Sequence, residues 1–520
     1  MMVLFILIFV SLLRICAIAT DKKYSETAAG QTSYKLTVKH QRGTIYDTNM
    51  VPITNTETEI IGALTPANGA ISEVRDYLYD EQVGSLAHRL SEGKPVLVRL
   101  KEEINGQFVK SITVRTSAGA EQLAPHLIGY VNGTGHGVSG VEAAFDSVLY
   151  SDKSVGFLYS RSALGDILEE YNVIVENYAL AETDGVKLTI DSKIQQAVER
   201  ATADMKAGAV IVSEVGSGKI RALASYPTYD ISNISDYLND PAAPLINRAF
   251  CAYNVGSVFK LCVAAAALED ESFGETIHRC TGSIEIAGKT FACHKASGHG
   301  AVDMNDAIMG SCNTYFYTLA MQIGAEKIYN MASSLGFGNR YFFADNLYTE
   351  QGFLPTVEDI GISQQSLANL AIGQGSLMLT PISLLPLYEA IANGGVYHKP
   401  TLVEGVIEDG VLSEAEETYP TRVMSKNTAE LLKSSLCDVI NEGTGTSAKP
   451  SRCSAAGKTA TAQTGWIKDG RAVDHSWLCG FFPAENPRYV VVIISEDTSG
   501  EGTPCGPLFS AVCDAVFALN

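Results

Sequence analysis

The sequence predicts an α+β protein whose main antiparallel sheet is built from strands at both ends of its C-terminal part. Four apolar segments have strand character: 208–215, 219–226, 476–483 and 488–496. Gly216 and Gly218 lie between the first two and signal a hairpin. Before them, a strand over 186–190 leads to Asp191, which we expect to cap a long amphipathic helix. A closing helix is expected over 506–520, so helices should cover the sheet.

The part of the chain before residue 181 differs in character. Short strands and turns dominate it, and residues 38–49 are expected to form a strand that runs into a turn. Residues 73–90 and 140–150 have the apolar spacing of helices. We therefore predict a mostly β N-terminal domain over 20–180 and an α+β domain over 181–520.

Composition and charge set limits on the class of protein. The chain has 520 residues, of which 46% are hydrophobic, so it can bury a large core and form more than one domain. Its net charge of −20 repels phosphate backbones, and we expect no nucleic acid partner.

Residues 1–19 are apolar except for Arg14 and come close to the lower length limit for crossing a bilayer. We expect a retained membrane anchor there. A cleaved signal peptide and a buried helix are the alternatives, and neither a basic region nor a clean cleavage site supports the first of them.

The eleven cysteines include no C-x-x-C pair. Cys280 and Cys293 could form a disulfide or remain two free thiols. His294 and His299 follow closely, but their spacing fits no standard ligand pattern, so no metal is expected. The G-x-G-x-x-G pattern at 135–140 lacks the βαβ context of a dinucleotide site, and no cofactor is expected.

Ser257 and Lys260 stand three residues apart at the start of the apolar segment 261–269. Residues with this spacing share one helix face, so the amine can approach the hydroxyl. A serine hydroxyl becomes a good nucleophile only when a base takes its proton, and a buried lysine with a lowered pKa can be that base. The first N–H groups of such a helix also point to where an oxyanion would form. S-x-x-K is frequent by chance, so it needs support from other motifs.

Two later motifs supply that support. Ser311 and Asn313 precede an apolar helical segment, where an ordinary N-cap is the alternative interpretation. Lys458, Thr459 and Thr461 lie in a segment typical of an exposed edge strand, where the lysine could simply oppose aggregation. An edge strand can also pair with an extended peptide while a lysine and threonine hydroxyls hold its carboxylate.

S-x-x-K, S-x-N and K-T-x occur here in the order found in penicillin-binding proteins and class A β-lactamases. Over nearly its whole length the sequence resembles the class B penicillin-binding proteins, through segments that follow the order of that family: RGTIYDTN (42–49), GVSGVEAAFD (137–146), LTID (188–191), ALASYPTYD (222–230), NRAF (247–250), VGSVFK (255–260), GSCNTYF (310–316), GQG (373–375) and EGTGTSA (442–448). The resemblance implies a penicillin-binding transpeptidase domain behind an N-terminal pedestal domain.

The resemblance also implies the reaction of a serine-type D-Ala-D-Ala transpeptidase, which cross-links peptidoglycan stem peptides. Ser257 would attack the carbonyl of the penultimate D-Ala, with Lys260 as the general base. Ser311 would relay a proton to the leaving amine, and Asn313 would bind the substrate backbone. The N–H groups of Ser257 and Thr461 would form the oxyanion hole. A β-lactam would acylate Ser257 instead and leave slowly. The terminal carboxylate would be held by Lys458, Thr459 and Thr461.

Partners and location follow from the same resemblance. Residues 20–180 match the pedestal and leave no room for a glycosyltransferase module, so a SEDS-family glycosyltransferase in the membrane is the implied partner. The catalytic domain would then lie outside the cytoplasmic membrane, carried by the single anchor. The alternatives are a D,D-carboxypeptidase or β-lactamase-type hydrolase, and a non-catalytic β-lactam sensor or scaffold.

One residue departs from the family pattern at the K-T-x motif. Ala460 stands where the family usually has glycine. Glycine permits the closest backbone approach, so we expect the methyl group to narrow the substrate slot and to alter the kinetics without abolishing activity.

Overall fold

The structure is a computed structural model that describes residues 8–12, 14–15, 33–116, 119–162, 167–168, 173–177, 184–274, 277–500 and 502–519. Most of the expected anchor at 1–19 lies outside these residues, as does the expected domain boundary near residue 180. Among the residues described, no helix has both the length and the apolar character needed to cross a membrane.

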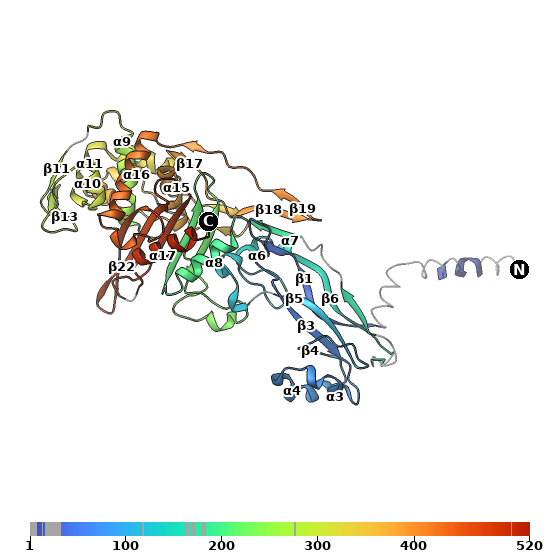
Figure 1. The fold of residues 1–520 in the computed structure, drawn as a ribbon. Helices are drawn as coiled ribbons and strands as arrows, with labels where there is room; N and C mark the ends of the chain where they lie inside the picture. Colours follow the sequence, from blue (N-terminus) through green and yellow to red (C-terminus); the bar gives the residue numbers. More distant parts are fainter. Residues whose placement is uncertain are drawn as a thin grey trace.

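A five-stranded antiparallel sheet with the strand order β10-β9-β23-β22-β21 lies at the centre of the C-terminal part. Its strands are β9 (Gly208–Glu214), β10 (Ile220–Tyr226), β21 (Ala456–Lys468), β22 (Arg471–Phe482) and β23 (Tyr489–Ser495). Gly216 and Gly218 both have positive φ in the hairpin between β9 and β10. Strands from the two ends of this part therefore share one sheet, as predicted (Figure 1).

Helices cover both faces of the sheet because alternate side chains of each strand are buried on opposite sides. On one face, Val491 and Ile493 pack in a core with two helices, α8 (Ser192–Ala201) and α17 (Cys505–Phe517). On the other face, Val490 and Val492 belong to a larger core with α9 (Lys260–Leu268), α11 (Asn313–Ile323), α15 (Pro381–Ala392) and α16 (Lys426–Asn441). The helix–sheet–helix arrangement confirms the predicted α+β class.

Shorter elements complete this part of the chain. The remaining helices are α5 (Pro125–Ile128), α10 (Met304–Met309), α12 (Ala325–Ser334), α13 (Val357–Gly361) and α14 (Gln364–Ala371). Short two-stranded sheets are formed by β11 (His278–Cys280) with β14 (Gly300–Val302), β12 (Ser283–Ile286) with β13 (Lys289–Ala292), β15 (Phe342–Ala344) with β16 (Leu347–Tyr348), and β17 (Val396–Tyr397) with β20 (Thr421–Arg422). Asp191 caps α8 as predicted, accepting hydrogen bonds from the N–H groups of Lys193 and Ile194.

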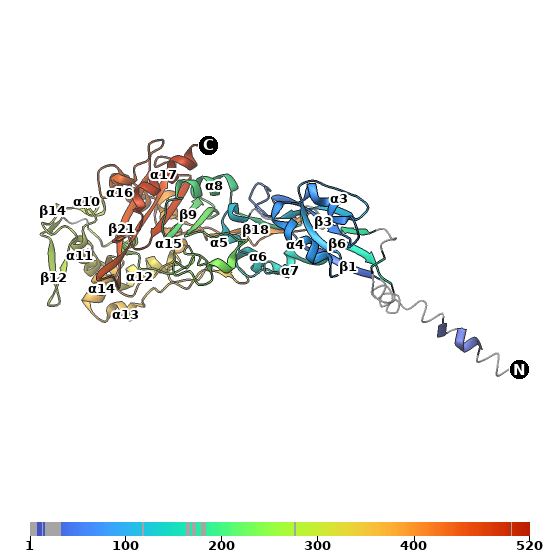
Figure 2. The same ribbon diagram turned by 90° about the horizontal axis from the view of Figure 1, so that it is seen from below.

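The N-terminal strands form two three-stranded antiparallel sheets at the end of the molecule away from this sandwich (Figures 1 and 2). One contains β1 (Ser33–Arg42), β6 (Tyr150–Ser160) and β7 (Ile174–Asn177). The other contains β3 (Glu57–Leu64), β4 (Val96–Leu100) and β5 (Val109–Thr116). Strands dominate this part, in agreement with the prediction from its short apolar segments.

The helical spacing over 73–90 is confirmed in part, because this segment is helical but does not form one continuous helix. Two helices, α3 (Ala70–Val74) and α4 (Asp80–Leu90), are separated by an extended Leu78. Leu78 is buried and bridges to Leu100 of β4, so its packing against the sheet outweighs helix continuity. The segment 140–150 is likewise two short helices, α6 (Gly140–Ala144) and α7 (Asp146–Leu149).

Residues 42–49 connect the N-terminal sheets to the sandwich. β2 (Thr44–Tyr46) lies parallel to β8 (Gly185–Leu188) in a sheet completed by β18 (Val403–Glu408) and β19 (Val411–Glu414). Directly after β2, Asp47 accepts hydrogen bonds from the N–H and hydroxyl of Ser192, at 3.1 and 2.7 Å. Arg42 forms ion pairs with Glu142 and Asp146, which lie in the segment 137–146. The β2–β8 pairing and the Asp47–Ser192 hydrogen bonds therefore join the two parts of the molecule, and the Arg42 ion pairs join the two N-terminal segments to each other.

Candidate active site

Ser257 lies in a short 3-10 turn, η4 (Gly256–Phe259), which leads directly into α9 with Lys260 as the first helical residue. The predicted helix start is confirmed, with the serine placed in the tighter turn. Gly256 has a φ of 59°, and a Cβ atom on it would lie 3.0 Å from the carbonyl oxygen of Thr461 in β21. Glycine therefore allows the turn to press against the edge strand.

A second glycine supports this turn from the opposite side. The N–H of Gly256 donates to the carbonyl of Gly373 at 3.0 Å, and a Cβ on Gly373 would lie 2.1 Å from the carbonyl oxygen of Gly256. Trp477 of β22 is fully buried and donates its indole N–H to the carbonyl of Asn254 at 3.0 Å. The sequence analysis assigned no role to Gly256, Gly373 or Trp477. The G-Q-G segment was the available signal for the second of them.

Lys260 is fully buried and reaches the S-x-N motif. Its Nζ donates to the carbonyl of Ser311 at 2.8 Å and to Asn313 Oδ1 at 2.7 Å, and it lies 3.2 Å from the Ser311 hydroxyl oxygen. Within the described residues, no hydrogen bond joins Lys260 directly to Ser257. Burial, followed by the nearby positive charge of Lys458, lowers the pKa of Lys260 well below its ordinary value. The amine is thus suited to be a base.

Ser311 adopts a backbone conformation that non-glycine residues rarely accept, with a φ of 53°. The N-cap of α11 is Cys312 rather than Ser311, and no side chain caps this helix end. The interpretation of Ser311 as an ordinary N-cap is therefore wrong. The strained turn instead points the Ser311 carbonyl and hydroxyl at Lys260, and such strain is common at functional sites.

Lys458, Thr459 and Thr461 lie on β21, which is the edge strand of the five-stranded sheet, as predicted. Thr461 is exposed, whereas Lys458 is fully buried and donates to the carbonyl of Thr459 at 3.0 Å. The Thr459 hydroxyl lies 3.0 Å from that of Thr444, which sequence reasoning missed. Burial lowers the pKa of Lys458 to about 7. The strand thus presents the Thr459 and Thr461 hydroxyls along its edge, whereas the titratable amine of Lys458 is buried on the side of Lys260.

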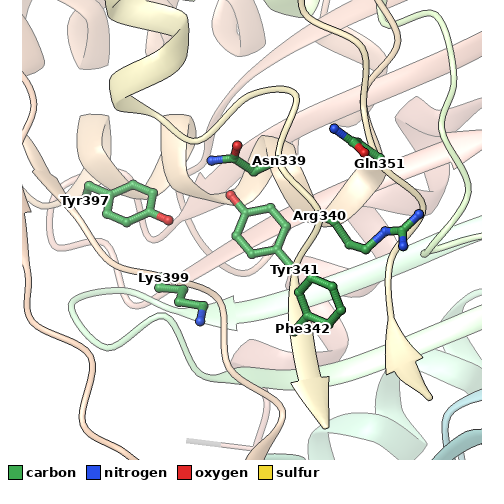
Figure 3. A pocket seen from close by; sticks show the side chains of 7 residues that line it. All are labelled: Asn339, Arg340, Tyr341, Phe342, Gln351, Tyr397 and Lys399. Carbon is green, nitrogen blue, oxygen red and sulfur yellow. The ribbon is translucent and has the colours of Figure 1, made fainter. Parts of the chain in front are cut away.

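A hollow elsewhere on this part of the protein contains none of the seven predicted site residues. It is lined around Tyr341 and Tyr397 by polar, aromatic and basic side chains (Figure 3). Its lining includes no serine or cysteine that could act as a nucleophile.

Comparison with known proteins agrees with this geometry. Residues 208–514 match the family described as the penicillin binding protein transpeptidase domain. That match covers more than half of the chain. The chain belongs to the class B penicillin-binding proteins.

The similar proteins have related names but are not all of similar length. Stage V sporulation protein D of Bacillus subtilis is 26% identical over 528 residues, which cover 94% of this chain and 79% of that protein. Penicillin-binding protein PbpB of Mycolicibacterium smegmatis is 30% identical over 424 residues, covering 75% of this chain and 62% of that protein. Peptidoglycan D,D-transpeptidase MrdA of Haemophilus influenzae is 30% identical, with 63% of this chain and 56% of that protein covered. The chain thus spans less than two thirds of the latter two.

Solved structures share the fold over almost the whole chain. The D,D-transpeptidase domain of a peptidoglycan glycosyltransferase from Eggerthella lenta matches with a TM-score of 0.66 and 26% identity, covering 93% of this chain and 99% of that one. A Helicobacter pylori penicillin-binding protein, PBP2, solved in complex with MreC, matches with a TM-score of 0.67 and 21% identity, covering 94% and 99%. The second match shows a shared fold.

In this class B penicillin-binding protein the methyl group of Ala460 is not where the sequence suggested. Ala460 is only 7% exposed and belongs to the larger core, whereas its neighbour Thr461 is exposed. Side chains alternate along a strand, so Ala460 faces the interior with Lys458, away from the open face that Thr461 occupies. The expectation that this methyl narrows the substrate slot has no support in the structure.

We therefore expect Ala460→Gly to change stability more than acylation. Loss of a buried methyl and the added chain freedom of glycine in a strand should lower the free energy of unfolding by about 1 kcal/mol. The rate of acylation by a labelled penicillin should change less than about threefold, since the open face is unaltered. Urea unfolding would measure the free energy of unfolding, and a time course of penicillin labelling would measure the acylation rate. A large change in that rate with unchanged stability would contradict the interior position of the Ala460 methyl group.

The titration of Lys458 gives a second expectation for this penicillin-binding protein. With a pKa of about 7, its amine is charged below that pH and becomes neutral above it, so its attraction for a carboxylate is lost as pH rises. In Lys458→Arg the guanidinium stays charged throughout. The ratio of the variant's second-order acylation constant to that of the wild type should therefore increase as pH rises through about 7. A constant ratio would show that Lys458 keeps its charge.

Proposed function

We propose that this chain cross-links peptidoglycan stem peptides through an acyl-enzyme on Ser257 and that β-lactams inhibit it by acylating the same residue. The observation that carries the proposal is the buried amine of Lys260, held at 2.7–3.2 Å from atoms of Ser311 and Asn313. The S-x-x-K and S-x-N motifs, about fifty residues apart in sequence, thereby meet at the turn that carries Ser257. The edge strand β21, which carries the K-T-x motif, lies beside this turn.

The donors and acceptors around Lys260 suit a neutral amine. Such an amine has two N–H donors and one lone pair. The carbonyl oxygen of Ser311 and Oδ1 of Asn313 can only accept hydrogen bonds, so they occupy the two donors. The lone pair is then left to take a proton from a hydroxyl. Ser257 and Ser311 supply the two hydroxyls needed for proton removal and proton return.

The reaction proceeds in two steps. Lys260 takes the proton of Ser257, whose Oγ forms an ester with the penultimate D-Ala carbonyl as the peptide C–N bond breaks. The terminal D-Ala leaves as an amine after receiving a proton relayed through Ser311. The acceptor amine of a second stem peptide then forms a new C–N bond as the ester C–O bond to Ser257 breaks, and a proton from that amine returns to Ser257 Oγ. Asn313 holds the substrate backbone. The terminal carboxylate of the substrate is bound by Lys458, Thr459 and Thr461.

A reaction with both donor and acceptor tests this function against hydrolysis. The full-length chain would be incubated with a stem pentapeptide that ends in D-Ala-D-Ala and with an acceptor amine, and products would be identified by mass. We expect a cross-linked product together with released D-Ala. Release of D-Ala without any cross-linked product would favour the carboxypeptidase alternative, and rapid turnover of penicillin would favour a β-lactamase.

The organisation of the chain is part of the proposal. Residues 1–19 would anchor the protein in the cell membrane, 20–180 would form the pedestal, and 181–520 would form the transpeptidase domain on the extracytoplasmic side. The elongated arrangement supports this, since the N-terminal sheets lie at one end and α11 and β21, which carry Asn313 and Lys458, lie in the other part (Figure 2). Such a pedestal would hold the site away from the bilayer.

The glycan strands would be polymerised by a separate SEDS-family glycosyltransferase in the membrane. The described N-terminal elements are two small β-sheets with short helices, which suit protein contacts better than catalysis. The Helicobacter pylori protein of similar fold was solved in complex with MreC, which supports the proposal that this chain also binds a partner protein. Co-purification of the full-length chain from membranes with the glycosyltransferase would test the partnership.

A further inference from the structure

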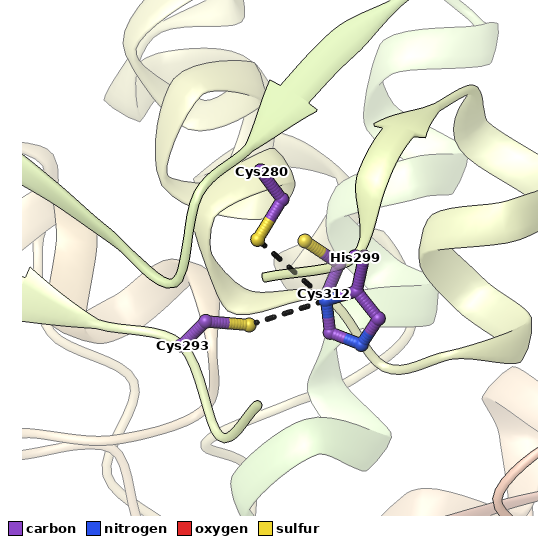
Figure 4. A group of neighbouring side chains, drawn as sticks. All are labelled: Cys280, Cys293, His299 and Cys312. Atoms are coloured by element: carbon purple, nitrogen blue, oxygen red, sulfur yellow. Dashed lines mark hydrogen bonds between the residues drawn. The ribbon is translucent and has the colours of Figure 1, made fainter. Parts of the chain in front are cut away.

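Four side chains with metal-binding atoms meet beside the S-x-N turn: Cys280, Cys293, His299 and Cys312 (Figure 4). Their ligand atoms, three sulfurs and one imidazole nitrogen, all lie within 4.8 Å of one another. The cysteines are buried and His299 is half-buried. All three cysteines are free thiols, so the disulfide considered between Cys280 and Cys293 is not formed.

The distances within this Cys₃His cluster suit a small tetrahedral ion. His299 Nδ1 lies 3.6 Å from the sulfur of Cys280 and 3.5 Å from that of Cys293. Zn–S bonds of about 2.3 Å and Zn–N bonds of about 2.0 Å in a tetrahedron place sulfur and nitrogen about 3.6 Å apart. Three soft thiolates and one imidazole make up a standard ligand set for structural zinc.

The local backbone is arranged to bring these ligands together. Cys280 ends β11, Cys293 directly follows β13, and His299 directly precedes β14. Gly282 and Gly298 have φ values of 97° and 76°, and a Cβ on Gly298 would lie 2.3 Å from the carbonyl oxygen of Cys280. The N–H of Cys293 donates to the carbonyl of Gly282 at 2.8 Å. The ends of the two-stranded sheet β11–β14 and of the β12–β13 hairpin, which lies between those strands in sequence, thus bring the ligands together.

The spacing of these residues in the sequence did not indicate a metal site. Cys293, His294 and His299 alone fit no standard pattern, which is why no metal was expected from the sequence. His294 is not a member of the cluster. Cys280 before these residues and Cys312 after them complete it. One of them, Cys312, is the middle residue of the S-x-N motif itself.

We propose that Cys280, Cys293, His299 and Cys312 bind one Zn²⁺ ion in a closed tetrahedral site that fixes the turn carrying Ser311 and Asn313. On binding, three thiols release their protons to solvent and four lone pairs bond to the ion, without any change of oxidation state. The four protein ligands leave no open position, so the ion acts structurally and not as a Lewis acid.

The position of Cys312 connects this zinc site to the proposed reaction. Ser311 is held at a φ of 53°, and no side chain caps α11 at Cys312. A bond from the Cys312 sulfur to zinc would hold this strained turn in place and, with it, the two partners of Lys260. Cys312 is therefore a positioning residue. Zinc binding does not depend on the proposed transpeptidase function, whereas its effect on acylation does.

Metal analysis of the purified full-length chain tests the site directly. We expect about one zinc per chain by mass spectrometry of the metals, and Co²⁺ in place of Zn²⁺ should give the absorption of a tetrahedral thiolate complex. Cys293→Ser and His299→Ala should lower zinc content at least about tenfold. Cys453→Ser, which alters a half-buried cysteine outside the cluster, should keep one zinc per chain.

Chelation and reconstitution test the structural role. Removal of zinc should lower the melting temperature and reduce the rate of penicillin acylation at least about tenfold, and added Zn²⁺ should restore both. A wild-type chain that holds no zinc and gives no cobalt spectrum overturns the site, even if the ligand variants fail to fold. A chain that holds zinc but is not acylated by penicillin supports the metal site and overturns the proposed function instead.

Discussion

Ser257→Ala should form no covalent adduct with a labelled penicillin, whereas the wild-type chain should carry one label on the peptide that contains Ser257. In the proposed mechanism the Ser257 Oγ is the atom that becomes esterified, and removal of a catalytic nucleophile costs roughly 10⁴-fold or more in rate. Mass mapping of the labelled full-length chain would measure both outcomes. Ser257 lies at a turn held by Gly256, Gly373 and the edge strand, so the loss of its hydroxyl should leave the fold intact.

A matched serine variant gives the control. Ser235→Ala alters an exposed serine outside the site and should be labelled like the wild type. Thermal melting of both variants would show that the fold is retained. Persistent labelling of Ser257→Ala, at any residue of the site, would place the nucleophile elsewhere and refute the proposed acyl-enzyme.

Lys260→Met should reduce the acylation rate by about 10²- to 10⁴-fold while leaving the label, once formed, on Ser257. The fully buried amine has a lowered pKa and donates hydrogen bonds to Ser311 and Asn313. In the proposed mechanism it therefore acts as the base and also holds the S-x-N turn. Time courses of penicillin labelling at increasing concentration would separate the acylation rate from the binding step, and the loss should fall on the rate.

Lys260→Arg distinguishes the two roles of the amine. Arginine keeps a positive charge and N–H donors but cannot give up its proton at accessible pH. If Lys260 acts as the base, this variant should be nearly as slow as Lys260→Met. A near-wild-type rate would show that charge and hydrogen bonding suffice. Lys193→Met, on the exposed surface of α8, serves as the matched control and should be labelled normally.

Local sequence patterns predicted the elements of this fold well where a single element decides its own structure. The β9–β10 hairpin, the cap at Asp191 and the edge position of β21 all follow from turn residues, capping residues and strand alternation. The pattern over 73–90 predicted helix but not the break at Leu78, which pairs with Leu100 of another strand. It was incomplete at Ala460, although alternation along β21 already places that methyl with buried Lys458.

The sequence by itself determined the chemistry of this protein, because nucleophile, base and carboxylate-binding groups each need a particular residue type within a short motif. It therefore predicted Ser257, Lys260 and their partner motifs in order. Only the tertiary structure decided how the motifs meet: the three hydrogen bonds of Lys260, the strained φ of Ser311, and the approach of three cysteines to His299. These contacts depend on loops that come together only in the folded chain, so the spacing of residues within one motif does not predict them.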